Sequence, residues 1–328
     1  MKQYEDFDFP EQYRSIAEEY VNYKHSLGFK YSFDEQRKIN SMLNYIYNNI
    51  EENPFQSINK EIVENYARMN NGERPRTAHI RQSHIRQFCI YLNLKGINAY
   101  VYPNELVQTG TDFIPYIFTR EEICKILYYA DRIGPNKNKF VNTPYVYPAI
   151  IRVLYGCGLR IGETLKLLTS EVDLENNVLI ITKGKNDVSR YVPISCSLSE
   201  YLYKYNEKVE RENNPYFFPA RHGEHYAPCT FSRKFKKLEV QAGIHQLPSG
   251  KYPRVHDLRH TFCVHALEKM INESIDSYCA LPGLSTYVGH KGLESTEKYL
   301  RLTKQYFIEV LKYSEHDAER IFPEVAYE

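Results

Sequence analysis

The chain has 328 residues and a formal net charge of +1, with 42% hydrophobic and 25% charged residues. This ordinary globular composition argues against long disorder and collagen-like repeats, and no run approaches the roughly 18 apolar residues of a membrane-spanning helix. Seven scattered cysteines without a C-x-x-C pair favour a reducing compartment over a disulfide framework or a zinc site. The N-terminus lacks an apolar signal segment, so we expect a cytoplasmic protein with no membrane partner.

The length suggests about two domains, each able to bury its own core. Between residues 11 and 95, apolar residues recur every three or four positions, as they do on helices with one buried face. This periodicity predicts helices around residues 16–27, 39–50, 60–69 and 77–94. The first part of the chain is therefore expected to be a small helical domain.

A break in periodicity separates this domain from the rest of the chain. Residues 103–115 carry Pro103, Gly110 and Pro115, as a linker would. Thr119, followed by Arg-Glu-Glu, is typical of a helix N-cap with acids in the first turn. We therefore expect a first domain over residues 1–102, a linker over 103–115 and a second domain over 116–328.

The second domain is expected to be mostly helical around one β-hairpin. A buried helix is predicted over residues 145–155, and a new helix starts at Arg160 after a Gly-Cys-Gly run. Apolar residues flanking a Gly-Lys-Asn-Asp turn predict strands over 178–182 and 190–194. Helices resume from residue 198. The predicted fold class is mainly α with a small antiparallel hairpin or sheet.

Positive charge is concentrated in two stretches despite the near-neutral total. Residues 68–95 hold six basic residues and one acid, and a second basic cluster lies at residues 233–237. In the first stretch, Ile85 and Phe88 can face the core while basic side chains meet phosphates. A solvated helix face explains either cluster about equally well. The candidates for DNA contact are Arg74, Arg76, Arg81, Arg86, Arg233, Lys234 and Lys237.

Four short patterns carry residues suited to phosphate chemistry: GLRIGE from residue 158, TKGK from 182, HDLRHTF from 256 and GH at 289. Arg160 and Arg259 offer planar forks of donors that match phosphate oxygens and stay protonated. Arg160 is expected in the first turn of a helix, where backbone N–H groups also attract an anion. His256 should share a helix face with Arg259. Glu163 is expected to orient an arginine or histidine, although a surface role is nearly as well supported.

Tyr299 is the candidate nucleophile. A tyrosine hydroxyl has an ordinary pKa of about 10 and reacts poorly at neutral pH. Beside Arg160 and Arg259, its phenolate should be favoured by charge. We expect His256 to accept its proton and Lys183, at the hairpin tip, to protonate the leaving oxygen. Because the arginines would supply the charge stabilisation that a metal gives elsewhere, we expect no metal and no cofactor.

Neighbouring residues offer simpler roles or rival assignments. Lys185 is a rival of Lys183, which we prefer because it directly precedes the turn glycine. His260 and His265 are expected to pack or cap within their helix rather than catalyse. Asp257 is expected to cap that helix rather than act as a base.

Together these patterns resemble the tyrosine recombinases, the phage-integrase-type site-specific recombinases. The resemblance covers nearly the whole chain, and the spacings of 23 residues from Arg160 to Lys183 and nine from His290 to Tyr299 are similar to those of the family. The six residues of the family's catalytic motif fall on Arg160, Lys183, His256, Arg259, His290 and Tyr299.

The resemblance implies a SAM-like core-binding domain, followed by a catalytic domain whose C-terminal helix docks on a neighbouring protomer. Tyr299 would form a 3′-phosphotyrosyl link, and strand exchange would pass through a Holliday junction. The implied partner is double-stranded DNA with two inverted half-sites, bound by a dimer per site and a tetramer in the synapse. An accessory excision or DNA-bending protein is a possible partner, and the implied role is that of an integrase or transposase of a mobile genetic element.

Two other functions remain open from the sequence. A type IB topoisomerase uses a similar style of active site and would relax supercoils without sequence preference. A degenerate family member would only hold DNA, although the presence of all six motif residues speaks against it.

Overall fold

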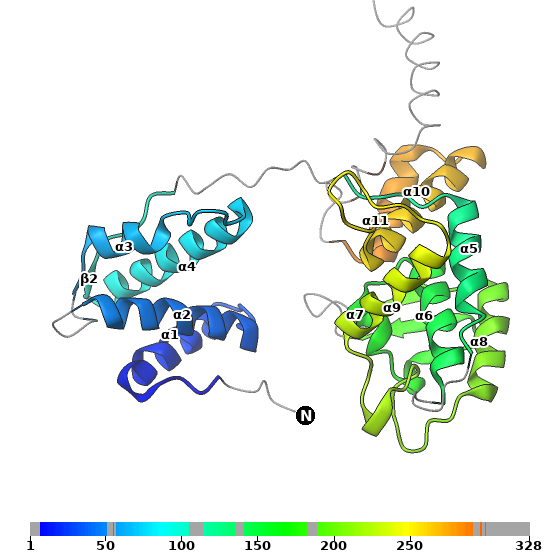
Figure 1. Ribbon diagram of the computed structural model, residues 1–328, viewed down its shortest axis with the longest axis horizontal. Coiled ribbons are helices and arrows are strands. Elements are labelled where there is room, and N and C mark those ends of the chain that lie inside the picture. Colours follow the sequence, from blue (N-terminus) through cyan, green and yellow to red (C-terminus); the bar gives the residue numbers. More distant parts are fainter. Residues whose placement is uncertain are drawn as a thin grey trace, which may run out of the picture. The chain divides into compact units, whose positions relative to one another are not determined.

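The computed structural model describes residues 7–50, 55, 57–104, 114–134, 141–182, 189–290, 296 and 299. The chain divides into two compact units, residues 1–113 and 114–328. The helices of the first unit are α1 (Arg14–Ser26), α2 (Phe33–Asn49), α3 (Lys60–Ala67) and α4 (Pro75–Leu94) (Figure 1). Those of the second are α5 (Arg120–Ala130), α6 (Thr143–Cys157), α7 (Ile161–Leu165), α8 (Cys196–Lys208), α9 (Pro228–Gln241), α10 (Val255–Asn272) and α11 (Ser277–Val288).

The first unit buries one apolar face of each of its helices, as the periodicity predicts. Tyr20, Leu43, Val63 and Phe88, from α1 to α4 in turn, belong to one core and are at most 1% exposed. Helix α4 starts at Pro75, two residues earlier than predicted, because a proline in the first helical position needs no N–H partner.

The first unit also contains a short strand pair that periodicity does not predict. Strand β1 (Ser57–Ile58) pairs in parallel with β2 (Asn98–Ala99). A pairing between segments about forty residues apart leaves no local pattern in the sequence, and two residues are too few for an alternation to show.

Helix α6 is the central element of the second unit. Ile150, Ile151 and Val153 lie on different faces of this helix, and each is 0% exposed. A helix that is apolar all round must be covered on all sides. Helices α5, α8 and α10 pack against it, and α6 runs through the middle of the unit in Figure 1.

The predicted hairpin is present and belongs to a small antiparallel sheet. Strand β4 (Val178–Ile181) pairs with β5 (Arg190–Pro193), and β3 (Val172–Asp173) adds a third strand on the other side of β4. The register places Ile181 opposite Arg190. Leu179, Ile181 and Val192 point into the core, whereas residues 183–188 lie outside the described residues.

The predicted fold class, mainly α with a small antiparallel sheet, is therefore confirmed. Helices α10 and α11 add a smaller core that includes Leu267, Leu284 and Tyr299. In the part of the chain that the structure describes, no helix is long and apolar enough to cross a membrane.

Candidate active site

Arg160 lies where α6 gives way to α7. Gly158 ends α6 with a φ of +60°, and a Cβ there would come within 2.3 Å of the Phe262 ring, so only glycine fits. Arg160 is then the N-cap residue of α7 instead of lying in its first turn. Its backbone N–H donates to Glu163 (3.1 Å), so a carboxylate of the chain already occupies the position predicted for an anion.

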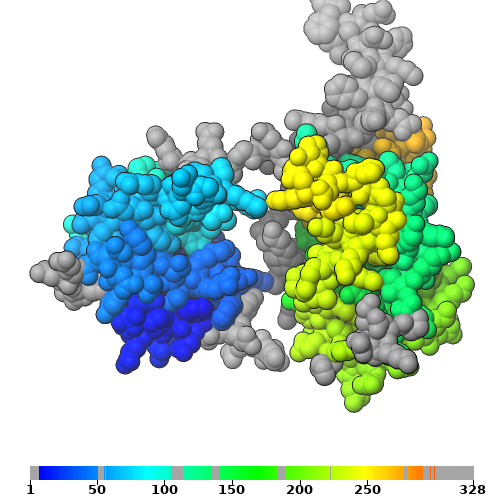
Figure 2. Space-filling view, viewed as in Figure 1, coloured from blue at the N-terminus to red at the C-terminus, as the bar shows by residue number. Residues whose placement is uncertain are grey.

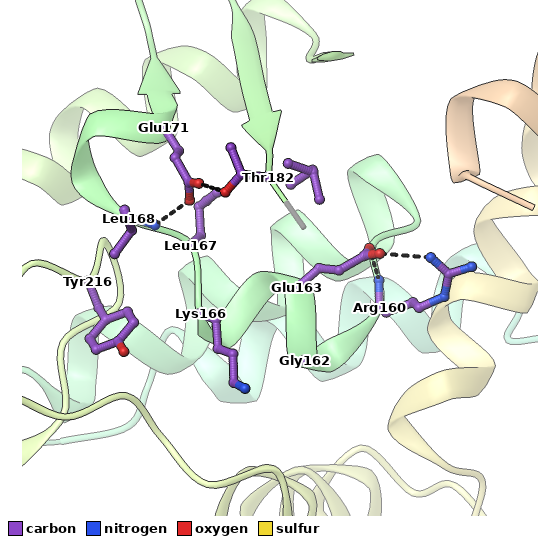
Figure 3. A pocket seen from close by; sticks show the side chains of 10 residues that line it. Arg160, Gly162, Glu163, Lys166, Leu167, Leu168, Glu171, Thr182 and Tyr216 are labelled. Carbon is purple, nitrogen blue, oxygen red and sulfur yellow. Dashed lines mark hydrogen bonds and ion pairs between the residues drawn. The ribbon is translucent and has the colours of Figure 1, made fainter. Parts of the chain in front are cut away.

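The Arg160 side chain joins α7 to the segment after α11. One nitrogen donates to Glu163 Oε1 and the other to the carbonyl of Gly289, both at 2.7 Å. Figure 3 shows the Glu163 carboxylate turned toward the Arg160 guanidinium. The prediction that Glu163 orients an arginine is in agreement with this contact. Its effect on the reaction stays a prediction.

Arg259 lies on α10 and is 2% exposed. Its guanidinium donates to the carbonyls of Gly158 and Val288, both at 2.7 Å. The pKa of Arg259 is lowered to about 10, mainly by burial and secondly by the charge of Arg160. These two guanidinium groups repel each other in a poorly solvated place, and an anion bound between them would relieve the repulsion. This arrangement suits a phosphate diester.

Arg190 is a site residue that the sequence analysis missed. From the first position of β5 it donates to both oxygens of Glu163 (3.0 and 3.3 Å) and to the carbonyl of Tyr287 (3.0 Å). Gly289 packs against it: with φ at +68°, a Cβ there would come within 3.0 Å of the Arg190 guanidinium. The hairpin strand, α7 and the end of α11 therefore meet at one side chain.

The Glu163 carboxylate is stabilised as an anion between these arginines. Burial alone would raise the pKa of Glu163, but the hydrogen bond and charge of Arg190, with the bonds from Arg160, hold it below the ordinary value. Because the side chain is only 6% exposed, these partners replace its water. A spacing of 27 residues gives no local signal for the pair.

Tyr299 is packed against α10 and is 1% exposed. Its hydroxyl is hydrogen-bonded to Nδ1 of His260 at 2.8 Å. The ring of His290 stacks on it, with centroids 6.2 Å apart, and Nδ1 of His290 bonds to Oγ1 of Thr296 at 2.8 Å. Three residues predicted as catalytic, Tyr299, His290 and Arg259, thus contribute to one site.

The two arginines favour the Tyr299 phenolate, as predicted, but burial outweighs their effect. Arg259 and Arg160 lower the pKa of Tyr299, as expected from their charge, but burial, together with Cys263, raises it well above the ordinary value. The phenol therefore keeps its proton at neutral pH. A nucleophile in this state needs an acceptor for that proton.

His260, expected to pack or cap within its helix, also makes a contact outside that helix. His260 holds the Tyr299 hydroxyl, whereas the ring of His256 lies edge-on to that of His260 with centroids 4.7 Å apart. His256 is exposed and His260 is 5% exposed. The signal in the sequence was the spacing of four between the two histidines, which places them on one helix face.

Of the simpler assignments, the structure agrees with the one for Asp257. Asp257 caps α10, because its carboxylate accepts the backbone N–H of Arg254 at 2.7 Å. His265 is hydrogen-bonded to the hydroxyl of Tyr155 on α6 at 2.9 Å, so it contacts a neighbouring helix instead of capping its own.

An open cavity of about 600 Å³ lies beside Arg160. Lys166 and Tyr216 line it, together with Thr182 at the end of β4 (Figure 3). Lys183 and its rival Lys185 directly follow Thr182 in the chain and lie outside the described residues. Among the residues that are described, no group of three or more His, Cys, Asp or Glu could hold a metal ion.

The basic residues of α4 do not all face outward as predicted. Arg81 is 16% exposed and pairs with Glu73 at 2.8 Å, and Arg86 donates to the carbonyl of Tyr102. Both guanidinium groups are therefore engaged within the first unit. Arg74 and Arg76, at the start of α4, are exposed.

The second basic cluster lies on α9, which is yellow-green to yellow on the face of the second unit seen in Figure 2. Arg233 and Lys237 are exposed, and Lys234 is half-buried. Phe231, Phe235 and Leu238 occupy the buried side of the helix. Its cations therefore lie on the side away from the core.

Comparison with known proteins identifies the family. Residues 117–306 match the model of the phage integrase family. The putative integrase/recombinase y4rB of Sinorhizobium fredii is 26% identical over 306 residues, which is 92% of this chain and 96% of that protein. The tyrosine recombinase XerA of Pyrococcus horikoshii is 28% identical over 202 residues, 61% of each chain.

Solved structures share the fold at low sequence identity. The XerH site-specific recombinase bound to a palindromic difH substrate has a TM-score of 0.59 at 20% identity, over 87% of this chain and 79% of that one. The Tn1549 transposon integrase in complex with transposon right end DNA has a TM-score of 0.62 at 15% identity, over 87% and 94%. Because the family model covers more than half of the chain, this protein belongs to the phage integrase family and is a tyrosine-type site-specific recombinase.

Proposed function

We propose that this recombinase cuts and rejoins DNA through Tyr299, which attacks a phosphodiester to form a 3′-phosphotyrosyl link and release a 5′-hydroxyl. The observation that carries the proposal is that buried Tyr299 lies within the electrostatic influence of two guanidinium groups, that of buried Arg259 and that of partly buried Arg160. Both lower the pKa of Tyr299; Arg259 is held by two backbone carbonyls, and Arg160 by the Gly289 carbonyl and the Glu163 carboxylate. Preorganised cations of this kind stabilise the charge that develops on a phosphate under attack.

The remaining steps are assigned to residues around this centre. Arg160 and Arg259 bind the non-bridging oxygens, and His290 supports the tyrosine ring against which it stacks. Exposed His256 faces the substrate side and donates a hydrogen bond to the phosphate. Lys183 protonates the leaving 5′ oxygen, from the segment that follows Thr182.

DNA is held by both units. Arg74 and Arg76 on α4, with Arg233 and Lys237 on α9, contact backbone phosphates, since all four side chains are exposed. Lys234 contributes from its half-buried position. The two units correspond to a core-binding domain and a catalytic domain, with residues 300–328, outside the described part, as the docking segment.

The DNA site in this proposal is a duplex with two inverted half-sites, and a dimer binds each site. Two such dimers form a tetramer that exchanges strands through a Holliday junction. The proposed role is that of an integrase or transposase of a mobile genetic element. The similarity to y4rB over most of both chains and the fold shared with the Tn1549 transposon integrase support this role. An accessory DNA-bending or excision protein would set the direction.

Recombination between two sites separates this function from topoisomerase activity. The full chain first selects its site from a random duplex library, and a plasmid carrying two copies of that site is then incubated with it. We expect inversion or deletion between the copies, and none on a plasmid without them. Relaxation of both plasmids at equal rates, without recombination, would identify a topoisomerase instead. Selection of a site without any strand cleavage would identify a DNA-holding protein.

A further inference from the structure

The hydrogen bond between His260 and Tyr299 links the only atom of the tyrosine that can attack phosphorus to a ring nitrogen. Nδ1 of His260 lies 2.8 Å from the hydroxyl oxygen, and both side chains are at most 5% exposed. Water is therefore largely kept from this hydroxyl. The proton must pass to a group of the protein.

Other described groups around the hydroxyl are poorer acceptors. Arg259 and Arg160 have no acceptor lone pair and stay protonated. Nδ1 of His290 is engaged with Thr296. Cys263, one turn after His260, is close enough to raise the pKa of Tyr299, and a neutral thiol is only a weak acceptor. His260 is thus the group best placed to receive the proton.

We propose that His260 is the general base that takes the phenol proton of Tyr299 during strand cleavage. The inference rests on the proposed function of Tyr299. The hydroxyl oxygen forms a bond to phosphorus while the bond from phosphorus to O5′ breaks. The phenol proton passes to Nδ1 of His260, and O5′ takes a proton from a protonated amine, the role proposed for Lys183. In rejoining, His260 returns its proton to the tyrosine.

The two histidines of α10 then have separate tasks. His256 and His260 are four residues apart with their rings in contact, yet only His260 is buried against the tyrosine. His256 is exposed to solvent. This division differs from the sequence-based expectation that His256 accepts the proton.

Substitution by asparagine separates proton transfer from packing. The amide oxygen in His260→Asn can accept the same hydrogen bond but is not a base. In single-turnover cleavage of a nicked suicide duplex carrying the selected site, we expect at least about a 100-fold slower rate with DNA affinity unchanged. His265→Asn is the matched control. His265 is also on α10 and also bonds to a tyrosine hydroxyl, but that tyrosine is Tyr155, away from the site. This control variant should cleave at the unchanged rate.

A second experiment makes the nucleophile itself more acidic. Ring-fluorinated tyrosine at position 299 ionises more readily and depends less on a base, so it should restore most of the cleavage rate of His260→Asn. A rate for His260→Asn within threefold of the unchanged chain, or a defect that fluorination does not relieve, would overturn the role of His260. An adduct that survives Tyr299→Phe would overturn the proposed function itself, which is a distinguishable result.

Discussion

The carboxylate of Glu163 lies 3.0 Å from the guanidinium of Arg190, and this ion pair joins α7 to the strand that leaves the hairpin. Arg190 also holds the carbonyl of Tyr287 near the end of α11, while Glu163 holds Arg160. We therefore expect a shift of the hairpin strand to reach Arg160, one of the two arginines proposed to bind the phosphate. The next two predictions test this connection.

Arg190→Gln should destabilise the protein by about 3 kcal/mol, because it leaves the buried Glu163 carboxylate with one charged partner fewer. Cleavage should fall as Arg160 loses its fixed position. Arg152→Gln is the control: its pair with Asp131 (2.7 Å) is more exposed and should contribute about 1 kcal/mol or less. Urea unfolding and suicide-substrate cleavage measure both effects. Equal losses in the two variants would show that the Arg190 pair has no special role.

Gly289→Ala should reduce cleavage more than stability alone explains. Its positive φ costs an alanine about 1 kcal/mol, and the new Cβ displaces the Arg190 guanidinium. Gly243→Ala carries the same backbone penalty, with a φ of +74° and no atom within 4 Å of the added carbon. We expect the unfolding midpoint to fall further for Gly289→Ala than for Gly243→Ala, because the Arg190 pair is disturbed as well, and cleavage to be lost only at position 289 under conditions where both variants are folded. Full cleavage by Gly289→Ala would contradict the account.

Glu239 should make the protein less stable as the pH rises. It is 0% exposed on α9, neither carboxyl oxygen has a hydrogen-bond partner among the described residues, and burial with the charge of Asp257 raises its pKa to about 8. An unfolded Glu releases its proton near pH 4.3, so stability should fall by about 1.4 kcal/mol per pH unit from there up to about pH 8. Glu239→Gln should remove this slope in urea titrations, and an unchanged slope would assign it to another group.

Arg74→Ala and Arg76→Ala should each lower the salt dependence of DNA binding by about one phosphate contact. Arg81→Ala should instead destabilise the first unit, because it breaks the pair with Glu73. Fluorescence anisotropy on the selected duplex at several salt concentrations measures the slope. A slope that changes for Arg81→Ala and not for the other two would place the interface on a different side of α4.

Sequence reasoning succeeded where the determining contacts are local. The periodicity of α1 to α4, the Thr119 cap and the alternation of strands β4 and β5 are all patterns within a few residues. It failed where partners are distant in the chain: Arg190 meets Glu163 across 27 residues, and His260 meets Tyr299 across 39. Likewise, the sequence placed Arg81 among the phosphate contacts because it shows that Glu73 is present but not that its carboxylate pairs with Arg81. Spacing located the catalytic candidates, but their burial and bonding come from packing.

Covalent capture on the suicide duplex tests the central claim most directly. The selected site, nicked so that the released strand diffuses away, is incubated with the full chain, and the DNA-linked peptide is identified by mass spectrometry. We predict a 3′-phosphate joined to Tyr299, no adduct with Tyr299→Phe, and an undiminished adduct with Tyr287→Phe, whose hydroxyl bonds to the carbonyl of Pro193. An adduct on another residue, or one that persists in Tyr299→Phe, would contradict the account.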